Sequence, residues 1–582
     1  METKQLTETE ESTEMKQLTL GDLSFQRIRE GNYIYADKTE YIYNMLAGNR
    51  FNNCFLSRPR RFGKTLLLTT IRELFQGDRE LFRGLWIDNS DYKFERHPVL
   101  DFTMTYINVD TKDKLIGRIM EDLESFAVMH GVTLTSKYLD KMFEQLLKGI
   151  CEKYEARAVI LVDEYDVPVT DHLRDEDVAR GNIDVLHSFY RSLKSFSDYV
   201  HFAFVTGISR FAMAALDSGP NNFTDISLLP EFAAICGFTM DEMDTIFGDR
   251  YVDTLDILIS EGRIDRNADI AAMKNKIEYY YDGYNWLGKD RVLNPFSLIR
   301  FFFHKKFGTF WPKSGKPSHL SELVRENPLD YIRPKLVAIG EGEITDAELS
   351  VLKPVPVLFH SGYLTIDRPM TKDEIIQYKI DNKELPDNKD LLFAEDDDDE
   401  QKFILKISNR EVAKGFEYAL FHSAFDQKDK FFGNFAKKLP VALLNNNSKK
   451  TASLFHDLLA AISFEQHEPS EKHYHAVLQA AIIATGLEVI GQASGSQGKS
   501  DMSAFFKNTR VVIEVKYCRT GQNFAVDINQ AEKELAAALD KAADQIKSKD
   551  YAAPFRVAGK NLVGVAIAVR GRDEVAVRFI EP

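Results

Sequence analysis

Two groups of residues in this sequence have types and spacings that suit phosphate chemistry. The first is Gly63-Lys64-Thr65, which follows the apolar segment at 54–57. It matches the end of the pattern GxxxxGK[ST], in which backbone N–H groups and a lysine bind phosphates and the hydroxyl binds Mg²⁺. The first glycine of that pattern is replaced by Arg58, and Pro59, which follows, has no N–H to donate. We therefore expect the arginines of the loop to contribute, so that the phosphate-binding residues are Arg58, Arg60, Arg61, Phe62, Gly63, Lys64 and Thr65.

Two later strand ends carry polar residues that could complete a nucleotide site. The apolar segment at 158–163 ends in Asp163 and is followed by Glu164, and a second apolar segment carries Thr206 near its end. In a doubly wound parallel sheet these ends lie beside the phosphate loop. We expect Asp163 to hold Mg²⁺ together with Thr65, and Glu164 to orient or deprotonate the attacking water. Thr206 would face the terminal phosphate, with Arg210 as a further candidate. The alternative is that these strands simply end in polar turns.

The second group lies near the C-terminus. If the segments around 501–506 and 510–517 form a hairpin centred on Lys507-Asn508, Asp501 stands opposite Glu514, and Lys516 shares their face. Two carboxylates that close repel each other unless a cation lies between them, and their oxygens suit Mg²⁺ or Mn²⁺. Lys516 could then orient a water or stabilise negative charge on a phosphoryl group. The alternative is a solvated hairpin face with a cross-strand charge network.

The chain has 582 residues and a net charge of −15, with 44% apolar and 28% charged residues. This composition is ordinary for a globular protein of roughly three or four domains and excludes a collagen-like or mostly disordered chain. The four cysteines are far apart without a CxxC pair, which argues against a zinc site or a disulfide framework. No apolar run approaches about 18 residues, and the first residues are acidic and polar. We expect a cytoplasmic protein without a membrane partner.

Changes in the hydrophobic pattern divide the chain. Short apolar strands alternate with amphipathic stretches at first, which predicts a parallel sheet covered on both faces. Helices follow, one of them capped by Thr239 with Glu242 three residues on. Two strands around 359–369 and 402–408 flank an acidic insertion loop at 381–401, which includes the solvated run Asp396–Glu400. We expect a flexible tail at 1–20, an α/β core at 21–235, a helical lid at 236–320, a connecting region at 321–464 and a second α/β domain at 465–582.

Several longer stretches resemble one known family. They include FQRIREGNYIYADKTEYIYNML, SRPRRFGKT, VILVDEYDVPV, FVTGISRF and YYDGYNW, spread over roughly residues 20–320. They resemble the AAA-ATPase-like family of bacteria and archaea, in which an ATPase is joined to a C-terminal nuclease of the PD-(D/E)XK type. The likeness resumes over roughly residues 465–560. The SRPRRFGK loop, with its departure from the general phosphate-loop pattern, is shared with this family.

The resemblance implies a fold and assigns roles. The fold would be a P-loop NTPase parallel sheet with a helical lid, a connecting region for which a winged helix is one candidate, and a restriction-endonuclease-like α/β domain. The ATP site would contain Lys64, Thr65, Asp163 and Glu164. The segment Asp37-Lys38-Thr39 matches a further family motif, with a capped helix start as its simpler interpretation.

In the C-terminal domain the resemblance supports Asp501, Glu514 and Lys516 as the nuclease site. Glu471 would be an additional acid, and Gln545 would point into the site. The expected cofactors are ATP and Mg²⁺, with Mn²⁺ a candidate at the nuclease site. Nucleic acid, DNA in the first place, is the expected partner, and a homo-oligomer is a further candidate. The chain would couple ATP hydrolysis to phosphodiester cleavage; alternatively, it is an ATP-controlled switch or scaffold whose C-terminal fold only binds nucleic acid or a partner.

Overall fold

The computed structural model covers the whole chain and describes most of it. The described residues are 15–21, 24–106, 108–172, 175–209, 223–314, 338–340, 354–375, 401–416, 429–460, 471–485, 488–491, 494–495, 498–499, 502–506, 509–518, 528–548, 561–571 and 574–581. The predicted tail up to residue 14, the acidic insertion, Arg210, Asp501 and the Lys507-Asn508 turn lie outside these residues. The chain forms two compact units, Met1–Gly315 with Leu336–Glu411, and Lys316–Lys335 with Val412–Pro582.

The first unit is built on a five-stranded sheet in the order β2-β3-β4-β1-β5. All four pairings are parallel, so every strand ends at the same edge. The central strands are buried along nearly their whole length because helices cover both faces. The predicted parallel sheet is confirmed. Its strands are β1 (Asn53–Ser57), β2 (Val99–Thr103), β3 (Ala158–Asp163), β4 (Val200–Gly207) and β5 (Thr224–Asp225).

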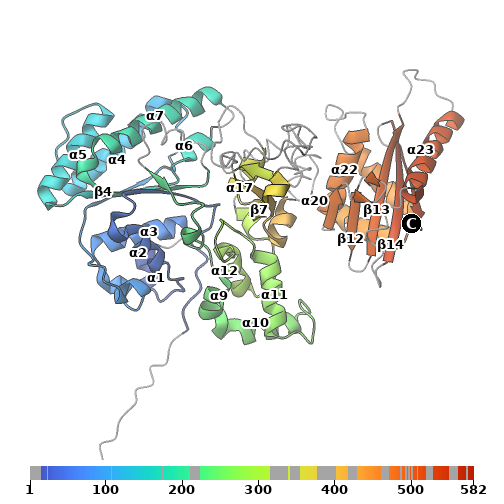
Figure 1. Ribbon diagram of the computed structural model, residues 1–582, viewed down its shortest axis with the longest axis horizontal. Coiled ribbons are helices and arrows are strands. Elements are labelled where there is room, and N and C mark those ends of the chain that lie inside the picture. Colours follow the sequence, from blue (N-terminus) through green and yellow to red (C-terminus); the bar gives the residue numbers. More distant parts are fainter. Residues whose placement is uncertain are drawn as a thin grey trace, which may run out of the picture. The chain divides into compact units, whose positions relative to one another are not determined.

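Helices form a layer on each side of this sheet (Figure 1). One layer contains α1 (Phe25–Glu30), α2 (Thr39–Leu46) and α3 (Lys64–Gln76), and α3 follows directly from the loop after β1. The other contains α4 (Lys112–His130), α5 (Leu139–Tyr154) and α7 (Glu176–Ser195), whose apolar faces share one core with the sheet. The short α6 (Val167–Thr170) follows β3.

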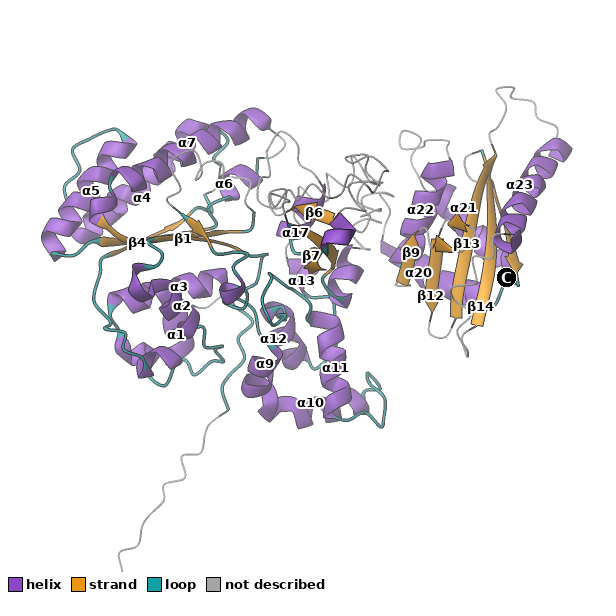
Figure 2. Ribbon diagram, in the orientation of Figure 1, coloured by secondary structure: helices purple, strands orange, loops and turns teal. Residues whose placement is uncertain are grey.

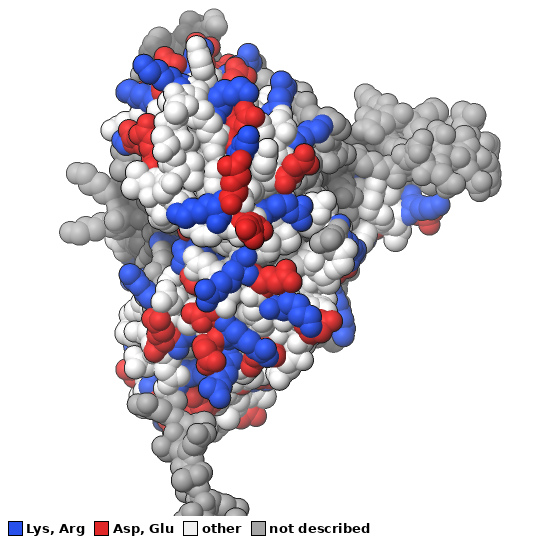
Figure 3. All heavy atoms as spheres, turned by 90° about the vertical axis from the view of Figure 1, so that its left-hand side faces the viewer, with Lys and Arg blue, Asp and Glu red and all other residues white. Residues whose placement is uncertain are grey.

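The side of the first unit that carries α4 and α5 has charges of both signs (Figure 3). Several of them form exposed ion pairs three or four residues apart, such as Arg118 with Glu121 and Lys141 with Glu144. Exposed pairs of this kind contribute little to stability. The mixture of signs also makes this face a poor match for a polyanion.

The lid is a cluster of four helices with its own aromatic core. They are α9 (Met240–Phe247), α10 (Tyr251–Ser260), α11 (Ile270–Tyr281) and α12 (Pro295–His304). The predicted cap of α9 is confirmed, because Thr239 accepts from the N–H of Glu242 and the Glu242 side chain accepts from the N–H of Thr239. The two strands expected around the insertion are also present. With β6 (Ala338–Gly340), β7 (Leu364–Pro369) and β8 (Lys402–Ile407) form a small antiparallel sheet, accompanied by α13 (Trp311–Ser314) and α17 (Pro354–His360).

The second unit contains a mixed five-stranded sheet in the order β15-β14-β13-β12-β9 (Figure 2). Only β13 and β14 pair in parallel. One face packs on α20 (Asp429–Leu444), α21 (Ser448–Ala460) and α22 (Glu471–Ala484), and the other on α23 (Ile528–Ser548). The strands are β9 (Glu488–Gly491), β12 (Met502–Phe506), β13 (Thr509–Cys518), β14 (Asn561–Arg570) and β15 (Glu574–Ile580), besides the short pair β10 (Ser494–Gly495) and β11 (Gly498–Lys499).

Candidate functional sites

The loop between β1 and α3 turns sharply into the helix at Gly63. This residue caps α3 with a φ of 94°, a conformation that glycine adopts without strain. Phe62 anchors the loop, because its buried ring packs edge-on against Tyr284 at 4.7 Å and against Trp286 at 5.4 Å. The N-terminus of a 13-residue helix therefore opens next to Lys64 and Thr65, which is the geometry that favours phosphate.

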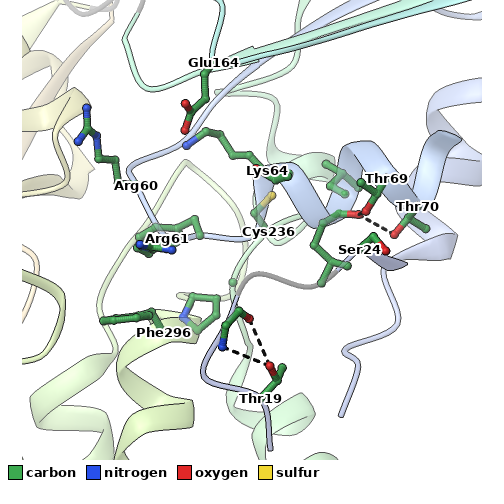
Figure 4. Close-up of a pocket in the computed structure, with 18 of the residues that line it drawn as sticks. Thr19, Ser24, Arg60, Arg61, Lys64, Thr69, Thr70, Glu164, Cys236 and Phe296 are labelled. Atoms are coloured by element: carbon green, nitrogen blue, oxygen red, sulfur yellow. Dashed lines mark hydrogen bonds between the residues drawn. The ribbon is translucent and has the colours of Figure 1, made fainter. Parts of the chain in front are cut away.

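Lys64 is buried, and its ammonium closes the loop on itself. Nζ donates to the carbonyl oxygens of Arg58 at 2.9 Å and Pro59 at 3.1 Å. Burial lowers the pKa of Lys64, and the carboxylate of Asp163 opposes that shift. In Figure 4 the side chains of Lys64 and Glu164 point toward each other.

The end of β3 brings two carboxylates to the loop. The Thr65 hydroxyl donates to Asp163 Oδ2 at 2.6 Å, across 98 positions of sequence. The N–H of Glu164 donates to Asp163 Oδ1 at 3.0 Å, and Glu164 itself has a φ of 52°. This left-handed conformation is uncommon for a glutamate and turns the chain out of the strand. Burial, with the neighbouring Asp163 next in importance, raises the pKa of Glu164.

Arg58 does not join these residues, contrary to the expectation that it contacts phosphate. Its side chain is fully buried, and its two terminal nitrogens donate to main-chain carbonyl oxygens. The guanidinium also stacks 4.2 Å from the ring centre of Trp286, and burial lowers its pKa to about 10. Arg58 therefore holds the loop to neighbouring segments. Its acceptors are Ser57, Ser227, Phe232 and Ala233, at 2.8, 2.9, 3.1 and 3.4 Å.

Thr206 is likewise turned away from the loop's open side. Its buried hydroxyl donates to the carbonyl oxygen of Leu56 in the neighbouring strand at 2.9 Å. The hydroxyl thus fixes the pairing of β1 and β4 instead of facing a phosphate. Arg60 and Arg61, in contrast, line the open side together with Phe62 and Gly63.

Sequence reasoning missed Asp166, two residues after Glu164. The buried carboxylate accepts from the N–H of Ser209 at 2.7 Å and from its hydroxyl at 2.7 Å, and it is also reached by the N–H of Ile208. Tyr165 adds a hydrogen bond from its hydroxyl to the Ser209 carbonyl oxygen at 2.9 Å. These residues tie the chain after β4 to the end of β3. The only signal in the sequence was a further acid in DEYD.

A cavity of about 890 Å³ opens in front of the loop. Its polar end contains Arg60, Arg61, Lys64, Thr65 and Glu164. The rest of the lining is mixed, with polar residues such as Asn108, Asp110 and His172 as well as apolar residues of the N-terminal segment and the lid. The apolar lining residues include Leu20, Ile28, Ile34, Ile235, Phe238 and Ile299.

The Asp37-Lys38-Thr39 segment starts α2, as its simpler interpretation predicts. Asp37 accepts from the N–H of Thr39 at 2.9 Å and from its hydroxyl at 2.6 Å. The second oxygen of Asp37 accepts from the N–H of Trp86 at 2.6 Å. Asp37 therefore both caps the helix and fastens it to the segment around 86.

The hairpin of the second unit has the predicted register. Its described pairs run from Met502↔Ile513 to Phe506↔Thr509. Val511, Ile513 and Val515 face the core that contains α22, so Glu514 and Lys516 project on the side of α23. Asp501, the predicted partner of Glu514, lies outside the described residues.

Three of the predicted residues meet beside β13. The ammonium of Lys516 donates to Glu514 Oε1 at 3.0 Å and to Glu471 Oε1 at 3.2 Å. Glu514 is fully buried, whereas the Glu471 side chain is 50% exposed at the start of α22. Opposite Glu514 and Lys516 in β14 stand Ala566 and Ala568, which are fully buried in the core shared with α23.

Two further residues lie on the helices that pack on the two faces of this sheet. Tyr474 is buried, donates to the carbonyl oxygen of Gly571 at 2.6 Å and stacks on Tyr517 at 5.0 Å. It thereby orients the first turn of α22, which carries Glu471. Gln545 lies on α23 and is half-buried.

Within the described residues, no three histidine, cysteine, aspartate or glutamate side chains are grouped closely enough to hold a metal ion. Among the same residues, no helix combines the length and the apolar character that crossing a membrane requires.

Two parts of the chain match known protein families. Residues 19–217 match a family described as predicted AAA-ATPase, and residues 469–579 match one described as PD-(D/E)XK nuclease superfamily. An "uncharacterized protein in vnfD 5'region" of Azotobacter chroococcum mcd 1 is 29% identical over 574 residues, which cover 96% of this chain and 98% of the relative. The likeness to that protein therefore includes both units. The chain combines an AAA-ATPase-like domain with a C-terminal domain of the PD-(D/E)XK nuclease superfamily.

Proposed function

We propose that the first unit binds ATP with Mg²⁺ and hydrolyses it. The observation that carries this proposal is the convergence of Lys64, Thr65 and Glu164 on one cavity of about 890 Å³ that also has apolar lining residues. A triphosphate suits the charged end, which also contains two arginines, and a nucleoside suits the apolar part.

The residues present fit Mg²⁺, because the Thr65 hydroxyl and the Asp163 carboxylate are neighbouring oxygen donors. The ion would be held by these two residues and would neutralise phosphate charge. Lys64 would exchange its bonds to the loop carbonyls for bonds to phosphate oxygens. Glu164 would orient the attacking water and accept its proton, a role for which a raised pKa is favourable.

The second unit would hydrolyse phosphodiester bonds of nucleic acid, most readily DNA, with Mg²⁺ or Mn²⁺. The contact of Lys516 with two carboxylates, one of them fully buried, supports this proposal. Continuing the observed hairpin register by one pair is the reason for including Asp501. Carboxylate oxygens of this kind suit a divalent ion, which would activate water. Lys516 would stabilise negative charge as water attacks phosphorus and the P–O bond breaks.

Cleavage of a plasmid by the full-length protein in Mg²⁺, compared with EDTA, tests the nuclease. We expect Glu514→Gln to lower cleavage by at least about a hundredfold and to leave ATP turnover intact. Asp540→Asn is the matched control, because Asp540 is an exposed carboxylate on α23 that pairs with Arg578. Unchanged cleavage by the Glu514 variant would refute the assignment.

The same cleavage assay distinguishes the proposed nuclease from the alternative function. Binding of the plasmid without metal-dependent cleavage by the wild-type protein would favour an ATP-controlled switch or scaffold. In that case Lys516 and its two carboxylates would serve the stability of the fold.

A further inference from the structure

Lys38 is a buried lysine whose ammonium joins two segments that lie far apart in the sequence. Nζ donates to the carbonyl oxygen of Ala234 at 2.8 Å and to the two carboxylate oxygens of Glu242 at 2.6 and 2.8 Å. Glu242 is held in turn by the N–H of Thr239, which donates to Oε2 at 2.8 Å. One side chain thus ties both ends of the segment 234–242 to the start of α2.

The segment between these two attachment points forms a wall of the cavity in front of the phosphate loop. Residues 235–238 line that cavity, and so does Lys38. The wall is also fixed from behind: Phe238 and Leu293 exchange main-chain hydrogen bonds of 3.2 and 2.7 Å. Gly237 has a φ of 91°, and a Cβ there would lie 2.9 Å from a methyl group of Val292. The contacts of residues 235–238 with neighbouring segments therefore restrict small displacements of this wall.

A second lysine also pairs with a carboxylate of α9, the helix that carries Glu242, and comparing the two pairs shows what is particular to Lys38. Lys274 contacts Asp244 of α9 at 2.6 Å, but its side chain is 29% exposed, and neither residue lines the cavity. The Lys38 side chain is 9% exposed at the same separation from its carboxylate. Burying an ammonium is costly even when it is paired, and burial lowers the pKa of Lys38 against the effect of Glu242. Of the two lysines that pair with α9, the buried one is therefore the one that lies at the cavity.

We propose that Lys38 is a positioning residue that holds the wall 235–238 against the base and ribose of the bound nucleotide. This inference rests on the proposed ATP site. Within the wall, Ile235 and Phe238 have side chains that suit a planar base, whereas Cys236 lies near enough to Lys64 and Asp163 for their charges to act on the pKa of its thiol. The residues expected to contact phosphate belong to the loop and to the end of β3. Loss of the ammonium would loosen the nucleoside part of the site more than the phosphate part, whose contacts belong to the loop and to the end of β3.

Calorimetric titration of the full-length protein with two ligands in Mg²⁺ tests this division. ATP carries base, ribose and phosphates, whereas inorganic tripolyphosphate carries only phosphates. We expect Lys38→Met to weaken ATP binding by about tenfold and to change tripolyphosphate binding by less than about twofold. Lys274→Met, which removes the exposed pair from the same helix, is expected to leave both affinities within about twofold.

The outcomes are distinguishable. Equal weakening of both ligands in Lys38→Met, or no weakening of either, would overturn the inference while leaving the ATP site in place. A wild-type protein that binds neither ligand would overturn the ATP site itself, and the inference with it. If Lys38→Met does not fold, as judged by circular dichroism, Glu242→Gln removes the negative charge and one of the two acceptor oxygens of Nζ, and it is expected to give the same selective loss in weaker form.

Discussion

Neighbouring arginines in the phosphate loop have different environments, and these decide what each can do. Arg58 is fully buried and its two terminal nitrogens donate to carbonyl oxygens, whereas Arg60 and Arg61 line the cavity. An arginine without access to the cavity cannot contact a phosphate there, whatever its position in the pattern. The same reasoning applies to Thr206, whose hydroxyl is bonded to Leu56.

Arg58→Met is therefore expected to affect stability more than binding. The substitution removes the arginine donor from the buried carbonyl oxygen of Ser227, and leaving such a group unsatisfied costs about 1–3 kcal/mol. We expect urea to unfold this variant at clearly lower concentration than Arg60→Met. A variant with unchanged unfolding but much weaker ATP binding would contradict the structural role.

The role proposed for Glu164 predicts how the rate of ATP hydrolysis depends on pH. Its raised pKa means that it gains a proton at higher pH than an ordinary glutamate. Since a general base acts in its deprotonated form, the rate should fall as pH decreases through that raised pKa. Glu164→Gln is expected to lower the rate by at least about a hundredfold, to retain ATP binding and to lose this acid limb. Steady-state rates measured across pH provide the test, and an unaltered acid limb in the variant would exclude Glu164 as the base.

At the scale of elements, the small antiparallel sheet lies against the phosphate loop within the first unit. The indole N–H of Trp311 donates to the Arg60 carbonyl oxygen at 2.9 Å. Gly362, just before β7, has a φ of 84°, and a Cβ on it would lie 2.8 Å from ring atoms of Pro59. Elements more than 250 positions later in the chain therefore set the shape of the loop.

Gly362→Ala is expected to destabilise the first unit and to weaken ATP binding. Alanine at positive φ costs more than about 1 kcal/mol, and here the new methyl group also displaces Pro59. Gly262→Ala is the matched control, since Gly262 has a φ of 65° but nothing within 4 Å of an added Cβ. Thermal unfolding and ATP titration of both variants separate the strain from the contact. Equal behaviour of the two variants would argue against the contact.

At the scale of the whole molecule, one passage between the two units follows Glu411, the last residue of the first unit. Its carboxylate is fully buried and accepts from the N–H groups of Phe310 and Trp311. Because Trp311 also contacts the phosphate loop, the end of the first unit is connected to the candidate ATP site through one residue.

Glu411 makes the stability of the first unit depend on pH. Burial raises its pKa from 4.5 to about 7, so the folded state retains a proton that the unfolded state has lost. Its stabilising contribution is complete below the unfolded pKa and is lost as pH rises through the folded value. Glu411→Gln is expected to reduce the loss of stability between about pH 5 and pH 8. Urea unfolding followed by tryptophan fluorescence measures this, because Trp86, Trp286 and Trp311 all lie in the first unit; an equal loss in the variant would contradict the prediction.

Much of this molecule was predictable from its sequence. Strand and helix periods indicated the parallel sheet, the lid and the cap at Thr239, since these features depend on neighbouring residues. The alternation of Glu514 and Lys516 with apolar residues indicated the hairpin, and the observed register agrees with it. The loop–helix junction at Gly63 was predictable for the same local reason.

The tertiary structure decided the features that depend on residues distant in the chain. Several hydrogen bonds join positions that are 40 to 200 residues apart: those of the buried side chains of Arg58 and Thr206, those between Asp166 and Ser209, and those that attach the cavity wall to Lys38. At such a separation the sequence pattern carries no information on contact. Local periodicity states which face of an element is buried, but it does not state which element covers that face. For that reason the residue types at both sites could be read from the sequence, whereas which of them reach the cavity could only be read from the fold.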